Sequence, residues 1–182
     1  GRSGFSGNPT TNSGATCSVC HVAGGASVPI VDIVGPTTID AGSTAAFYVV
    51  LAGGPATTGG VNISSGDHVG DLAPYDSALY LLDGELTHTA PRAFSDGATA
   101  FPFFYTAPNY DTVVTLYAAG NSTDGNLDLL GDGVGTTSKQ LTVQNGFEEP
   151  PPPPDPPEGE LEATLFATGL SNPVAIANAG DE

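Results

Sequence analysis

The chain has 182 residues, which is enough for one full domain with additional segments. Lys and Arg total 3 while Asp and Glu total 20, so the formal net charge is −17. A surface this acidic repels nucleic acid and anionic lipid, which argues against both as partners. No stretch approaches the ~20 apolar residues of a membrane span, so we expect none.

Residues 1–27 are rich in Gly, Ser, Asn and Thr and have no hydrophobic period. We expect an irregular segment here rather than a helix or strand. The opening stretch GRSGFSGNP is typical of a mature end exposed by removal of a signal peptide. Together with the acidic, lysine-poor composition, it indicates a secreted or surface-exposed protein.

Both cysteines of the chain lie in this segment, at Cys17 and Cys20, and His21 follows at once. This C-x-x-C-H spacing is the attachment signature of a c-type haem. Two thiols three positions apart reach the two vinyl groups of one porphyrin, and the adjacent histidine is then held as an axial ligand of the iron. The segment therefore predicts one covalent haem c.

Two other interpretations of the cysteine pair stay open. A redox or structural disulfide is one, although the βαβ context of thioredoxin-type sites is absent. Half of a zinc site is the other, although no second C-x-x-C or H-x-x-x-H motif completes four ligands.

A haem iron normally takes a second axial ligand, and the chain contains no methionine to supply it. The remaining histidines are His68, in a turn-like acidic stretch, and His88, at the end of a strand pattern. We expect His88 to be the ligand, with His68, a five-coordinate iron or a neighbouring chain as alternatives. Bis-histidine iron transfers electrons and does not readily bind oxygen or peroxide.

Residues 28–146 have a different pattern, in which short β-branched and aromatic runs alternate with Gly, Pro, Asp and Asn. No stretch has a helical period. Seven short strands predict an all-β domain, an antiparallel sandwich of immunoglobulin-like or reeler-like architecture. The runs are 28–35, 44–53, 60–65, 77–89, 98–108, 112–121 and 138–145.

The loop at 122–133 offers oxygen donors at alternating positions, as calcium loops do. No glutamate closes the loop, and the glycine is misplaced for an EF-hand. We expect a solvated acidic turn, with calcium as the weaker hypothesis. The candidate ligands are Asp124, Asn126, Asp128 and Asp132.

Residues 147–160 form a proline-rich linker, with seven prolines in the eight positions 150–157. Proline fixes φ and lacks the amide donor, so these eight positions predict a semi-rigid spacer about 25 Å long. Beyond it, 161–182 has strand character but is too short for a core of its own. We expect this tail to add a strand to a neighbouring sandwich, which would give head-to-tail self-association and a haem-containing filament.

The residues GFSGNPTTNSGATCSVCH, GELTHTAP and FFYTAP resemble secreted bacterial haem-motif domains of the choice-of-anchor V type, which have a reeler-like sandwich. This resemblance covers about residues 3–145. It implies a single haem c on Cys17 and Cys20 with His21 proximal, and it makes His88 the distal candidate. Separately, LFATGLSNPVAIANAGDE resembles the first strand of the soluble quinoprotein glucose/sorbosone dehydrogenases, which are propellers that bind pyrroloquinoline quinone.

These observations predict an extracellular mono-haem cytochrome that transfers electrons and is not itself an enzyme. Its partners would be redox proteins and other copies of the chain. One alternative is a structural or adhesive surface module. The other is the electron-accepting domain of a longer quinoprotein dehydrogenase.

Overall fold

The structure, a computed structural model, describes residues 1–147. These residues form a β-sandwich of two sheets, which confirms the predicted fold class. Within this range there is no α-helix, and hence no helix with the length and apolar character of a membrane span. The expected linker at 147–160, apart from its first residue, and the expected tail at 161–182 lie outside the described residues.

The smaller sheet has four strands in the order β1-β3-β9-β5, all antiparallel to their neighbours. Its long central pair is β3 with β9, which run side by side over nine residues each. The strands are β1 Ile30–Val34, β3 Thr44–Ala52, β9 Ala98–Thr106 and β5 Asp71–Pro74.

The larger sheet has the order β2-β11-β10-β4-β7-β6, and β8 pairs with β4 beside this path. One pair, β2 with β11, is parallel, so this sheet is mixed rather than purely antiparallel. The strands are β2 Thr38–Asp40, β11 Gly133–Gln144, β10 Thr112–Thr123, β4 Thr58–Ser65, β7 Glu85–His88, β6 Leu79–Leu82 and β8 Arg92–Ala93.

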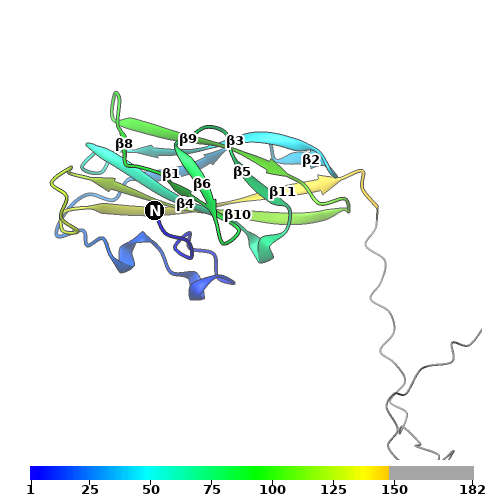
Figure 1. Ribbon diagram of the computed structural model, residues 1–182, viewed down its shortest axis with the longest axis horizontal. Coiled ribbons are helices and arrows are strands. Elements are labelled where there is room, and N and C mark those ends of the chain that lie inside the picture. The colour runs from blue at the N-terminus through cyan, green and yellow to red at the C-terminus, as the bar shows by residue number, and fades with distance from the viewer. Residues whose placement is uncertain (148–182) are drawn as a thin grey trace, which may run out of the picture. The chain divides into compact units, whose positions relative to one another are not determined.

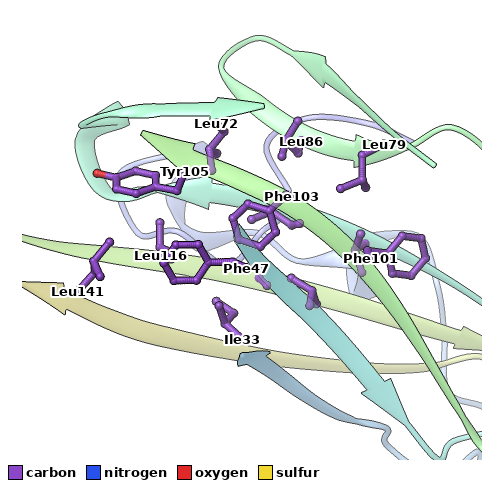
Figure 2. Close-up of a cluster of buried hydrophobic side chains, with 14 of the residues drawn as sticks. Ile33, Phe47, Leu72, Leu79, Leu86, Phe101, Phe103, Tyr105, Leu116 and Leu141 are labelled. Atoms are coloured by element: carbon purple, nitrogen blue, oxygen red, sulfur yellow. The ribbon is translucent and has the colours of Figure 1, made fainter. Parts of the chain in front are cut away.

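The core lies between the two sheets and is built from alternate residues of their strands (Figure 2). Phe47 of β3 stacks on Phe103 of β9 with 5.6 Å between ring centroids, and it meets Tyr105 edge-on at 6.3 Å. The fully buried side chains include Phe47, Leu51, Ile63, Leu86, Phe101, Phe103, Tyr105, Leu116 and Leu141. This aromatic and aliphatic core is the one that the period of two predicts.

All seven predicted runs contain a strand. The run at 77–89 divides into β6 and β7 at Asp83 and Gly84, where φ is 51° and 80°. Such a two-residue turn, with positive φ at both positions, is the hairpin that Asp-Gly favours. The sequence missed β2, β5 and β8, which have only three, four and two residues and too few alternations to give a periodic signal.

The N-terminal segment, residues 1–27, lies outside the sandwich beside the larger sheet, and two 3₁₀ turns interrupt it: η1 Asn12–Gly14 and η2 Cys17–Val19 (Figure 1). As a result β4 is buried on both faces. Val61 and Ile63 belong to the core, whereas the outward Asn62 and Ser64 bond to the N-terminal segment.

Candidate functional site

Hydrogen bonds between polar groups join the N-terminal segment to β4 and β7. The amide of Phe5 donates to Oδ1 of Asn62 at 2.7 Å, and the hydroxyls of Ser6 and Ser64 lie 2.8 Å apart. The amide of Gly4 donates to the buried carboxylate of Glu85 at 2.5 Å. These bonds fix the segment against β4 and against β7, the strand that ends at His88.

The two cysteines lie on a tight turn, η2. The side chain of Thr16 caps it by accepting from the amide of Ser18, and the amides of Cys20 and His21 both donate to the carbonyl of Cys17, at 3.2 and 3.0 Å. Cys17, Cys20 and His21 all border one cavity. Both thiols are free, and burial raises the pKa of Cys17 to about 11, with Cys20 as a smaller contribution.

A buried carboxylate holds the ring of His21. Nδ1 lies 2.6 Å from Oδ2 of Asp132 and 3.0 Å from Nδ2 of Asn121. Asp132 lies just before β11 and Asn121 on β10, so the larger sheet positions both. Backbone bonds between Val22 and the 129–131 backbone fix the register of the segment beside them. With Nδ1 engaged, Nε2 is the nitrogen left to bind a metal.

His88 ends β7 and reaches the backbone of β4. Its Nδ1 lies 3.1 Å from both the amide and the carbonyl of Val61. The ring lies against Gly60, because a Cβ at that glycine would be 2.5 Å from Cε1 of His88. Burial lowers the pKa of His88, which the Val61 backbone only partly offsets, so the ring is neutral at pH 7, the form that binds metals.

The cysteine turn and His88 border the same cavity, which has a volume of about 380 Å³. This volume falls in the range of roughly 300–1,000 Å³ that is typical of ligand and cofactor sites. Apolar side chains of Phe5, Val61 and Leu129 contribute to its wall, and Arg2 is the basic residue at it. The full lining is Gly1, Arg2, Phe5, Cys17, Cys20, His21, Val61, Asn62, Thr87, His88 and Leu129.

The structure brings together the four residues predicted to bind haem, although the sequence separates His21 from His88 by 67 positions. The donor set fits a c-type haem: two free thiols for thioethers and two imidazoles engaged at Nδ1. His68, the alternative ligand, lies on η3 Gly66–His68 and borders a different cavity, with Asp71 and Asp83.

The four candidate calcium ligands do not share one role. Asp124 accepts bonds from the amide and side chain of Asn126, and Asn126 accepts from the amide of Asp128, as in a solvated acidic turn. Asp132 instead bonds to His21. No three His, Cys, Asp or Glu residues within 1–147 are grouped to hold a metal ion. Calcium binding stays a prediction that titration calorimetry tests.

Sequence reasoning missed three residues of the site: Asp132 as a partner of His21, Asn121, and Gly60 beneath His88. The sequence marks Asp132 only as one oxygen donor in an acidic loop. No local pattern relates it to His21, because the contact spans 111 positions. Gly60 lacks even that signal, since a glycine in a strand has several explanations.

No protein-family model and no curated protein matches the chain. Among solved structures, the sandwich is similar to a cohesin module from the family 33 glycoside hydrolase of Clostridium perfringens ATCC13124. The TM-score is 0.45 and the identity 11%, over 64% of this chain and 96% of that chain. This distant likeness says nothing about the site.

Proposed function

We propose that this protein is an extracellular mono-haem c-type cytochrome that transfers electrons and is not itself an enzyme. The observation that carries the proposal is the common cavity of Cys17, Cys20, His21 and His88. The cysteine motif alone predicted one axial ligand. The second histidine comes from a strand far along the chain, and its placement at the same cavity supports bis-histidine ligation.

Each residue of the site has a separate task in this proposal. Cys17 and Cys20 would hold the cofactor through thioethers, formed by addition of the two thiols to its two vinyl groups, and the imidazoles of His21 and His88 would bind its iron. Arg2, one of three basic residues in the chain, offers the propionates a cationic partner. When bound, the haem supplies the one-electron chemistry of its iron.

If His21 and His88 both bind the iron of one haem, the porphyrin and the two imidazoles would leave no position for a substrate, which supports electron transfer over oxygen or peroxide chemistry. The resemblance to secreted haem-motif domains of the choice-of-anchor V type supports the same assignment and an extracellular location. Partners in this proposal are redox proteins that exchange electrons with the haem.

The decisive experiment is to mature the full chain in a host that attaches haem c and to record a pyridine haemochrome spectrum. We expect one covalent haem per chain, lost in the double variant Cys17→Ala, Cys20→Ala. A colourless wild-type protein would contradict the proposal and favour the alternative hypothesis of a structural or adhesive surface module.

The axial ligands are tested separately by a matched pair of variants. We expect His88→Ala to convert the reduced spectrum from low-spin to high-spin, because one axial nitrogen is removed. His68→Ala, which removes the same side chain from the other cavity, should leave the spectrum unchanged. The reverse pattern would identify His68 as the ligand.

We also propose that copies of the chain associate through the tail at 161–182. The acceptor would be an edge strand of the sandwich, and β1 is one. It is hydrogen-bonded to a strand on one side only, and its outward Ile30 and Val34 are exposed. Solution size with and without residues 150–182 tests this, since a monomer in both cases contradicts it.

A further inference from the structure

The contact between His21 and Asp132 has a property that a simple surface ion pair lacks. Asp132 is 1% exposed, whereas the side chain of His21 is 28% exposed. A buried carboxylate is costly unless it is paired, because desolvation penalises the charge. Oδ1 of Asp132 has no partner among the described residues, so the bond to His21 is the one side-chain interaction that compensates this burial.

The hydrogen on Nδ1 follows from the two neighbours of the ring. One nitrogen holds one hydrogen, so it cannot donate to Asp132 and accept from Asn121 at once. The contact to the carboxylate is the shorter, 2.6 Å against 3.0 Å, and it is charge-assisted. Nδ1–H therefore donates to Asp132, and Asn121 is a neighbouring dipole.

We propose that Asp132 is the positioning residue of this site, which fixes the tautomer of His21 and makes its Nε2 a stronger electron donor. The inference rests on the proposed function. A carboxylate bonded to the far nitrogen of a metal-binding histidine orients the ring and raises its basicity. A more basic axial ligand favours the oxidised, more positive iron, so Asp132 lowers the reduction potential.

The test compares Asp132→Asn with Asp32→Asn in the haem-loaded protein. Both variants remove one negative charge, but Asp32 is exposed on β1 of the other sheet. Loss of an outer partner of a metal ligand typically changes affinity 10–100-fold. In Asp132→Asn we expect the ratio of oxidised to reduced protein at a fixed solution potential to fall about tenfold. For one electron, this corresponds to a reduction potential that is higher by about 59 mV. Equal potentials in the two variants overturn the inference.

A second measurement needs no haem. In the protein without haem, the ¹⁵N chemical shifts of the His21 ring should show that the proton is on Nδ1. In Asp132→Asn, the same shifts should show a mixture of the two tautomers. A wild-type His21 protonated on Nε2 overturns the inference. If wild-type protein takes up no haem at all, the proposed function fails, and this measurement alone decides the role of Asp132.

Discussion

The sandwich and the N-terminal segment are held by different kinds of interaction. Every buried hydrophobic residue of the described chain lies from Val31 onward, in or beside the strands. Of residues 1–27, only Ser6 and Asn8 are buried, and both are polar. The sandwich is thus stabilised by burial of apolar area, and the segment by directed hydrogen bonds to β4 and β7.

This difference bears on the proposed function, in which one chain combines a rigid scaffold with a site for a large cofactor. The core packs without any contribution from the segment, so the strand that carries His88 is positioned before a ligand binds. The segment adds little apolar burial of its own, and a covalently attached haem would supply the missing apolar surface. We therefore expect mutations to divide sharply between the two regions.

The largest effect should come from the core. Phe103→Ala removes a fully buried ring that stacks on Phe47, and such changes cost about 3–5 kcal/mol of the free energy of unfolding. Chemical denaturation measures it. Phe147→Ala, at a residue 82% exposed, is the matched control and should change stability by less than about 0.5 kcal/mol. Comparable losses in both variants would contradict the assigned core.

An intermediate effect, confined to the segment, should come from Asn8→Ala. Asn8 is buried, donates to the carbonyl of Ser65 at 3.1 Å and accepts from Thr10, so its loss leaves buried polar groups unpaired at about 1–3 kcal/mol. Hydrogen exchange of the Phe5 amide should accelerate while β9 stays protected. Asn126→Ala, whose bonds remain within an exposed loop, serves as the control. Uniform acceleration would mean that the two regions unfold as one unit.

The same division decides what the sequence could predict. Apolar residues at every second position revealed the sandwich, because its stability depends on that period. In β4, however, both faces are buried, and the outward Asn62 and Ser64 serve the segment rather than solvent. Their polarity is indistinguishable from that of an exposed face. The cysteine motif could be recognised because its three residues are close together in the sequence, and haem attachment there stays a prediction. The contacts of Asp132 and Gly60 depend instead on how distant strands align.

Tyr105 is a polar exception inside the apolar core, and its effect should depend on pH. Its hydroxyl donates to the carbonyl of Val69 at 3.1 Å, a bond worth about 1 kcal/mol. Burial raises its pKa to about 12, above the usual 10, so the unfolded chain loses this proton first. The stabilisation is present below pH 10 and is lost as pH rises toward 12.

In Tyr105→Phe, this contribution to the loss of stability at alkaline pH should be absent. Denaturation at several pH values between 9 and 12 measures it. Tyr48→Phe, at a partly exposed ring of β3, should keep the wild-type profile. If Tyr105→Phe loses stability over this pH range as steeply as wild type, ionisation of Tyr105 does not limit alkaline stability.

The smallest effect on stability, and the most local one, should come from Gly60→Ala. The new Cβ would lie 2.5 Å from Cε1 of His88, so the ring must swing away from the Val61 backbone while the strand keeps its register. Because the flexible His88 side chain moves rather than the backbone, we expect the free energy of unfolding to fall by about 1 kcal/mol, the lower end of the usual cost of overpacking. The displaced ring leaves its buried position, so its lowered pKa should return toward the usual value in an NMR titration of the apo chain.

Gly66→Ala is the matched control, since the nearest atom to its Cβ would be 3.4 Å away. In haem-loaded protein, Gly60→Ala should give a high-spin fraction and Gly66→Ala none. A low-spin spectrum in Gly60→Ala together with an unchanged His88 pKa would mean that the glycine does not hold the ring in place. The position of His88 would then depend on the N-terminal segment. In that case the sandwich would not position this histidine independently of the segment.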